Sequence, residues 1–259
     1  MIKSLIERCS PEFADKFLLE IIESESCKDV FGYETADDKV MLKGNCALSL
    51  AVAYYHFMRD CCGAYFTADH SLAYGDFALP SKNKEGEIKG RYRTCFEYTT
   101  FSCAACWWDW ERWEKEIDFM AMNGINMPLC VVGTEAVWMK TMLDLGMHEN
   151  LALAALSGPS FWGWQLSGCF DGYLPQARKE RIDKCLELGR SIADRVRDLG
   201  MMPVMYGFNG FVFRNFIQGK VRARMKKTEE WCFYPPQYQI SVRDTTFHKI
   251  GNLYYKNQS

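Results

Sequence analysis

The spacing of apolar residues divides the chain into two parts with different patterns. In the first part, a short apolar run at 17–22 precedes a hairpin pattern over 30–42 that turns at 36–38. A helical pattern follows, with Asn45 as the predicted N-cap and Gly63 just beyond the last turn. These elements predict a small α/β unit.

The second part repeats one order of elements. The predicted strands cover 91–98, 125–132 and 201–208. The predicted helices begin at Asp109, Thr134 and near Pro175, and end before Gly124, Gly146 and Gly200. Strand, helix, glycine, strand is the pattern of βαβ units and predicts a parallel sheet, in either a doubly wound fold or a TIM barrel. No G-x-G-x-x-G follows the first strand and the chain has no Walker A motif, which argues against nucleotide binding.

A polar stretch at 80–87 separates the two parts. It is charged, begins with Pro80 and contains Gly86, so we interpret it as a linker. We therefore expect one domain over residues 1–85 and a second over residues 90–259.

Composition narrows the class of protein. Of 259 residues, 48% are hydrophobic and the net charge is −2, so a nucleic-acid partner is not expected. No apolar run reaches about 18 residues, so we expect no membrane span. The start has no apolar signal-peptide core, and the 12 cysteines follow no small-domain spacing. We expect a cytoplasmic protein with reduced thiols; a start upstream of Met1 would leave export open.

Two groups of residues could carry metal or redox chemistry. Cys103 and Cys106 form a C-x-x-C, which could be half of a zinc site, a redox pair, or two structural thiols. No second pair of ligands has suitable spacing, and none of the four histidines is paired at i, i+4. We favour structural thiols and predict no metal and no cofactor.

The acidic candidates at the expected strand ends are Glu97, Asp109, Glu135 and Asp171. Glu135 could act as a general acid or base. It also falls in the first turn of a predicted helix, where the helix dipole favours a carboxylate, and we favour this structural interpretation. Asp109 is interpreted in the same way, as an N-cap. The pattern reveals no convincing pair of catalytic carboxylates.

Tryptophans supply a different signal. Trp110 and Trp113 fall on the apolar stripe of a predicted helix and are expected in the core. Trp162, Trp164 and Trp231 lie in segments that look like loops, where an exposed indole is unfavourable unless it binds a ligand. A flat apolar ring suits the C–H face of a pyranose.

The segment at 107–126 reads W-W-D-W-E-R-W-E-K-E-I-D-F-M-A-M-N-G-I-N. It resembles a long, specific block of the α-N-acetylglucosaminidases, glycoside hydrolase family 89, and the similarity extends to 54–63, 158–164 and 199–204. The resemblance implies a small α/β N-terminal domain followed by a (β/α)8 TIM barrel, here incomplete. It also implies removal of terminal α-linked N-acetylglucosamine from a glycan, with retention of configuration and without a metal.

The resemblance also implies particular residues. Trp164 and Trp231 match tryptophans that line the family's sugar pocket, and Cys95 and Glu97 align with substrate contacts on the first barrel strand, where the family usually has Asn and Cys. The mechanism needs two carboxyl groups about 5–5.5 Å apart. The family's acid/base lies in an Asn-Glu pair, which does not occur after position 201. We therefore expect both catalytic residues beyond Ser259. On this expectation the chain is a truncated enzyme, or one part of a split enzyme whose downstream half carries them.

Two other hypotheses remain open. One is a non-catalytic remnant that serves as a carbohydrate-binding or scaffold protein. The other is an unrelated α/β redox protein that uses Cys103 and Cys106.

Overall fold

The structure is a computed structural model that describes residues 1–24, 28–81, 83–96, 98–171, 176–214, 223–232 and 234–258. The fold is mixed α/β, and the chain forms two compact units, each assembled from three stretches. The first unit comprises Met1–Cys95, Trp110–Pro128 and Ile192–Val204, and the second comprises Phe96–Asp109, Leu129–Ser191 and Met205–Ser259.

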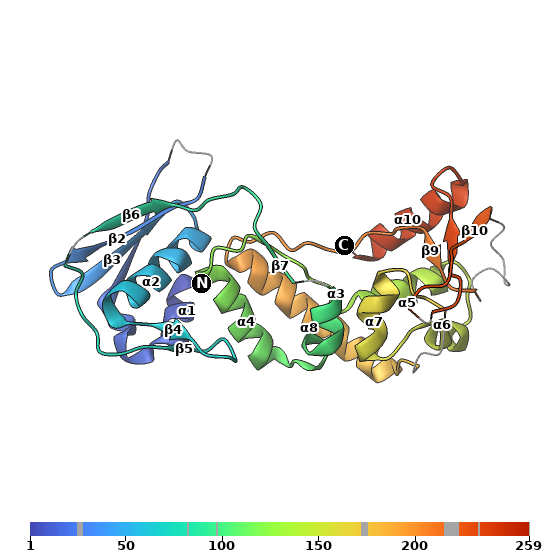
Figure 1. The fold of residues 1–259 in the computed structure, drawn as a ribbon, viewed down its shortest axis with the longest axis horizontal. Coiled ribbons are helices and arrows are strands. Elements are labelled where there is room, and N and C mark those ends of the chain that lie inside the picture. Colours follow the sequence, from blue (N-terminus) through green and yellow to red (C-terminus); the bar gives the residue numbers. More distant parts are fainter. Residues whose placement is uncertain are drawn as a thin grey trace. The chain divides into compact units, whose positions relative to one another are not determined.

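A four-stranded sheet forms the centre of the first unit. Its strands are β1 (Phe17–Ile21), β2 (Val30–Ala36), β3 (Lys39–Gly44) and β6 (Lys84–Glu87), in the order β1-β3-β2-β6. β1 and β3 are parallel and the other pairs are antiparallel. Helix α2 (Ala47–Cys62) packs on the sheet (Figure 1), and the rings of Phe17 and Tyr33 meet Phe57 at 5.4 and 5.7 Å. The short elements α1 (Ile2–Cys9), η1 (Pro11–Lys16), β4 (Tyr65–Phe66) and β5 (Leu72–Ala73) complete this part.

The predicted hairpin is confirmed. β2 and β3 pair antiparallel through a turn in which Asp37 has a φ of 56°, a left-handed conformation that aspartate tolerates better than most residues. Alternate residues of β3, among them Val40 and Leu42, are fully buried, as the period of two predicts.

The interpretation of 80–87 as a linker is wrong over its second half. Lys84–Glu87 form β6, an edge strand paired with β2. A Cβ on Gly86 would lie 2.8 Å from the ring of Phe31, so this close approach requires glycine. Edge strands are often polar and charged, which makes their sequence look like a loop.

The predicted N-cap of α2 is also wrong. The Sγ of Cys46 accepts a hydrogen bond from Ser49 N, so Cys46 is the cap. The Oδ1 of Asn45 instead accepts from Val30 N at 3.0 Å and from Ser49 Oγ at 2.9 Å, which joins the strand to the helix. The predicted end is confirmed, because Gly63 has a φ of 62°.

The first barrel strands lie side by side. β7 (Thr94–Cys95) pairs in parallel with β8 (Met127–Pro128), and Met202 and Val204 donate backbone hydrogen bonds to Asn126 and Pro128 at 2.8 and 2.9 Å. The described residues form no closed barrel. The predicted strands at 91–98 and 125–132 are too long, and helix α3 (Tyr98–Cys103) begins where the first should continue. The predicted strand at 201–208 is wrong, because this segment forms backbone hydrogen bonds at Met202 and Val204 but no strand element.

The predicted helices of the second part are present. They are α4 (Trp110–Met122), α5 (Thr134–Asp144) and α8 (Lys179–Asp198). The glycines after them have positive φ: 73° at Gly124, 85° at Gly146 and 78° at Gly200. Pro175 lies outside the described residues. No helix in the described part of the chain is both long and apolar enough to cross a membrane.

The remaining elements belong to the second unit. They are η2 (Ala105–Trp107), α6 (Glu149–Ala155), α7 (Pro159–Leu166), α10 (Thr245–Gln258) and a three-stranded antiparallel sheet of β9 (Phe211–Val212), β11 (Tyr238–Ile240) and β10 (Met225–Lys227). The core of the unit surrounds the fully buried Trp138 of α5, whose ring centroid lies 5.2–5.8 Å from those of Phe170, Phe208, Phe213 and Tyr254.

A buried carboxylate joins the three stretches of the first unit. The side chain of Asp118, on α4, is only 5% exposed. It accepts hydrogen bonds from Arg8 of α1 at 2.8–3.0 Å and from Arg195 of α8 at 2.9 Å. Because a buried charge is costly unless it is paired, this network fixes the three helices against one another.

The start of α5 differs from the prediction. Gly133, with a φ of 86°, is the N-cap, and Thr134 is the first helical residue; its Oγ1 donates to Val131 O at 2.6 Å. Glu135 does lie in the first turn, but it is buried, with 8% of its surface exposed. Burial raises the pKa of its carboxyl above the ordinary 4.5, although the Cys185 thiol hydrogen-bonds it and the Arg181 charge opposes the shift.

We predict that Asp118→Ala lowers the free energy of unfolding by about 3–5 kcal/mol, because it leaves the buried Arg195 guanidinium without its carboxylate. Urea unfolding followed by circular dichroism measures the change. Asp194→Ala removes the exposed partner of Arg197 and should cost less than about 1 kcal/mol. Equal losses in the two variants would contradict the role of Asp118.

We predict that Glu135→Gln alters how stability depends on pH. Because the folded-state pKa of Glu135 is raised, the folded protein holds this proton more tightly than the unfolded chain. The wild-type contribution is therefore present below pH 4.5 and is lost as the pH rises from 4.5 through the folded-state pKa.

The glutamine variant does not titrate, so its free energy of unfolding should gain on that of the wild type over this window. Chemical unfolding at a series of pH values measures the difference. Glu149→Gln makes the same chemical change at an exposed position and is the control. A constant difference between Glu135→Gln and wild type across the window would refute the prediction.

Candidate functional site

Two of the predicted site residues lie together in the second unit. Trp164 is half-buried on α7, and Trp231 is 54% exposed in a bridge with Tyr234. Their ring centroids are 6.0 Å apart and their planes are inclined at 46°. Two indoles at an angle present an apolar corner to solvent.

The opposite face of α7 explains why Trp164 is accessible. Trp162 and Trp164 both lie in α7, so their interpretation as loop tryptophans is wrong. Trp162 is buried, and its Nε1 donates to Thr134 Oγ1 at 2.9 Å. Gln165 is also buried; it accepts from Ser157 N at 2.8 Å and donates to Ala155 O at 2.9 Å. These bonds orient the helix and leave Trp164 on its outer side.

The segment that carries Trp231 is held by a side-chain amide. Gln237 Oε1 accepts from Asp171 N at 2.7 Å, and its Nε2 donates to Asp171 O at 2.9 Å. The carboxylate of Asp171 accepts from Arg214 N at 3.0–3.1 Å, and burial raises its pKa. Asp171, a candidate acid in the sequence, therefore has a structural hydrogen bond in this unit.

The other two predicted site residues are not part of this pair. Cys95 is half-buried on β7, opposite Pro128, in the first unit. Glu97 lies outside the described residues. Phe96 between them has a φ of 77°, an unusual backbone for a large side chain.

Among the described residues, three acidic side chains are buried: Glu116, Asp118 and Glu135. Asp118 is paired with two arginines, and Glu116 contacts Arg112 at 2.9 Å and His70 at 2.7 Å. Glu135 is the one of the three that makes no ion pair within 4.0 Å. A single buried carboxyl without an ion pair does not make the pair that glycoside hydrolysis needs.

The C-x-x-C has the surroundings of structural thiols. Cys103 is exposed and Cys106 is buried; the Sγ of Cys106 donates to Ser102 O at 3.4 Å, and burial raises its pKa. A raised pKa disfavours the reactive thiolate. In the part of the chain that the structure describes, no group of three His, Cys, Asp or Glu is placed to hold a metal.

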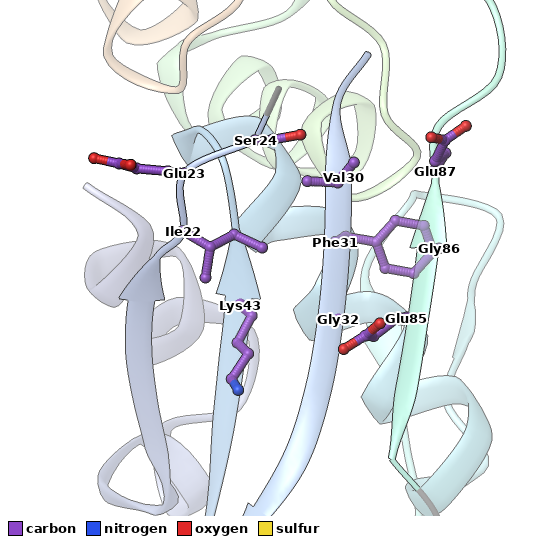
Figure 2. A pocket seen from close by; sticks show the side chains of 10 residues that line it. All are labelled: Ile22, Glu23, Ser24, Val30, Phe31, Gly32, Lys43, Glu85, Gly86 and Glu87. Atoms are coloured by element: carbon purple, nitrogen blue, oxygen red, sulfur yellow. The ribbon is translucent and has the colours of Figure 1, made fainter. Parts of the chain in front are cut away.

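A cavity of about 430 Å³ lies on the sheet of the first unit (Figure 2). Its lysine, Lys43, pairs with Glu34 at 2.7 Å, and Glu87 pairs with Lys28 at 2.6 Å. Figure 2 shows the Phe31 ring beside Gly86, between β2 and β6. The described buried polar atoms that lack a hydrogen-bond partner all lie elsewhere, so nothing in this cavity calls for a ligand.

A second cavity, of about 310 Å³, lies within the second unit. It is bounded by η2, the starts of α5 and α7, and the segment leading into α8. Its lining residues are Trp107, Glu135, Ser157, Gly158, Pro159, Gln176, Ala177, Arg178, Arg181 and Ile182. Sequence patterns singled out Glu135 but gave no reason to group it with residues 20 to 50 positions away, because only the packing of three helix ends brings them together.

The chain matches two family models. The α-N-acetylglucosaminidase N-terminal domain matches residues 1–80, and the α-N-acetylglucosaminidase TIM-barrel domain matches residues 91–259. Human α-N-acetylglucosaminidase is 31% identical over 229 residues, which are 84% of this chain and 30% of the human protein.

Solved structures agree with these matches. A family 89 glycoside hydrolase from Clostridium perfringens superposes with a TM-score of 0.92 at 26% identity, covering 99% of this chain and 30% of that protein. It has been solved with PUGNAc and, with two glutamates changed to glutamine, with its substrate GlcNAc-α-1,4-galactose. The chain thus spans 30% of the length of these relatives. With one family model covering residues 91–259 and another residues 1–80, the chain belongs to the α-N-acetylglucosaminidases of glycoside hydrolase family 89.

Proposed function

We propose that this chain supplies part of the sugar-binding site of a retaining exo-α-N-acetylglucosaminidase. Such an enzyme removes terminal α-linked N-acetylglucosamine from a glycan. The observation that carries the proposal is the pair of accessible rings, Trp164 and Trp231, 6.0 Å apart. Their apolar faces suit the C–H face of the sugar, while its hydroxyl groups remain free to bond elsewhere. We propose that Cys95 and Glu97 also contact the substrate.

Cleavage of the glycosidic bond needs two carboxyl groups, which we assign to residues outside this stretch. A retaining mechanism requires one carboxylate as nucleophile and one carboxyl as acid/base. Glu116 and Asp118 are already paired with cationic side chains, and Glu135 has no described carboxylate partner. We therefore propose that both catalytic carboxyl groups lie outside Met1–Ser259, on the same polypeptide or on the second half of a split enzyme. The two glutamates changed in the substrate complex of the Clostridium perfringens enzyme support a two-carboxyl mechanism in this family.

The same proposal includes a small domain over 1–85, a barrel segment over 90–259 and a cytoplasmic location.

The second candidate function is a carbohydrate-binding protein without activity. The ion pairs of Glu116 and Asp118 favour it, because carboxylates that are already paired do not act as nucleophile or acid/base.

We predict that purified 1–259 does not hydrolyse an aryl α-N-acetylglucosaminide. The reason is that we place both the nucleophile and the acid/base outside this stretch. Release of the aryl group, followed by absorbance, measures the rate, with buffer alone as the control. Turnover above background that a single Asp or Glu substitution within the chain abolishes would contradict the assignment.

We predict that Trp164→Ala and Trp231→Ala each weaken binding of N-acetylglucosamine to the chain by about 0.5–1.5 kcal/mol, because each removes one face of the corner. Saturation-transfer NMR titrations measure the dissociation constants. Trp110→Ala is the matched control, since Trp110 is 37% exposed on α4, in the first unit. Unchanged binding in both variants would remove the pair from the sugar site.

A further inference from the structure

We propose that the cavity of about 310 Å³ in the second unit is a second sugar site, which binds one neutral pyranose ring separately from the Trp164–Trp231 pair. Neither tryptophan of that pair lines the cavity. Its volume lies at the lower end of the range of about 300–1,000 Å³ found for small-molecule sites, which suits one ring.

Two buried polar groups in the cavity lack hydrogen-bond partners. The Oε2 of Glu135 and the Oγ of Ser157 are both shielded from solvent and make no hydrogen bond within the described structure. Their residues are 8% and 5% exposed. A buried polar atom without a hydrogen-bond partner destabilises the fold. Two of them lining one cavity indicate that a ligand with hydroxyl groups completes their bonding.

The contacts of Arg181 argue against an anionic ligand in the cavity. The Nη2 of Arg181 donates to Cys106 O, and its guanidinium lies 5.2 Å from the ring centroid of Trp107. This guanidinium is therefore already engaged by the protein. A buried carboxyl at the same cavity would also repel an anion.

A cationic ligand fits no better. Arg178 and Arg181 both line the cavity and oppose a positive charge. A hydroxyl group can either donate to Glu135 or accept from it, so a neutral polyol satisfies the carboxyl in both protonation states.

The remaining surface is apolar and accessible. Trp107 is 61% exposed, which is unusual for so large a ring, and Pro159 and Ile182 also line the cavity. A pyranose combines an apolar C–H face with a hydroxyl edge, and the lining holds a counterpart to each: indole and aliphatic carbons for the face, Glu135 and Ser157 for the hydroxyl groups.

The test uses purified 1–259 carrying Trp231→Ala, which weakens sugar binding at the tryptophan pair and leaves the cavity unchanged. Galactose, N-acetylglucosamine and acetate are titrated separately by saturation-transfer NMR. We expect one or both sugars to bind in this background and acetate not to bind. Adding Trp107→Ala should raise the sugar dissociation constant about three- to tenfold, the scale of losing one aromatic face.

Ser157→Ala in the same background should also weaken sugar binding. The substitution removes a buried hydroxyl that has no hydrogen-bond partner in the described structure, so the fold should tolerate it. If Trp107→Ala does not fold, Ser157→Ala alone decides the test. Trp110→Ala, in the first unit, is the matched control and should have no effect. Thermal melting of each variant checks folding.

The site is overturned if Trp231→Ala alone abolishes sugar binding, or if Trp107→Ala and Ser157→Ala leave it unchanged; the first result would leave the proposed function standing. Binding of acetate in place of both sugars also overturns it, because the arginines would then define an anion site. Sugar binding that survives Trp231→Ala and Trp164→Ala undiminished from wild type, but is lost with Trp107→Ala, supports this site and counts against the tryptophan pair.

Discussion

The first unit depends on one buried charge. Asp118 is nearly inaccessible, and Arg8 and Arg195 together compensate its buried charge. The three residues lie in α1, α4 and α8, which are distant in sequence, so a shift of any of these helices would weaken this compensation. This explains why the compact unit joins the N-terminal sheet to the stretches that carry the second and third barrel strands. Burial and the charge of Asp118 also raise the pKa of Cys9 to about 12, which keeps that thiol protonated.

In the second unit, the buried hydroxyl of Thr134 has a comparable structural role. It donates to Val131 and accepts from the indole of Trp162, so one buried hydroxyl joins the loop before α5 to α7. This bond to Trp162 sets the position of α7, and with it the positions of Trp164 and of the residues at the start of α7. The neighbouring Glu135 shares the first turn of α5, and the close approach of α8 at Gly133 brings Cys185 beside it. This short segment therefore positions Trp164 and one part of the cavity, whereas Trp231 depends on the hydrogen bonds between Gln237 and Asp171.

Both sites that we propose in this stretch of a family 89 protein are binding surfaces rather than catalytic carboxylates. The tryptophan pair offers two ring faces with few polar groups, whereas the cavity combines one indole with a buried carboxyl and a hydroxyl. A glycan has both kinds of surface, so the two sites are complementary in chemistry. The charged cavity of the first unit differs from both, because its lysine and Glu87 are satisfied by neighbouring side chains.

The sequence by itself determined the element types where local physics is decisive. Period-two burial fixed the β2–β3 hairpin, and glycines with positive φ at Gly63, Gly124, Gly146 and Gly200 fixed the helix ends, because few other residues adopt that backbone. The length and detail of the segment at 107–126 also determined the family.

The tertiary structure decided the features that depend on contacts between residues distant in sequence. It made 84–87 an edge strand, moved the cap of α2 from Asn45 to Cys46, buried Trp162 and exposed Trp110. It also gathered Glu135, Ser157 and Trp107 around one cavity, since side chains so far apart in sequence meet only through helix packing.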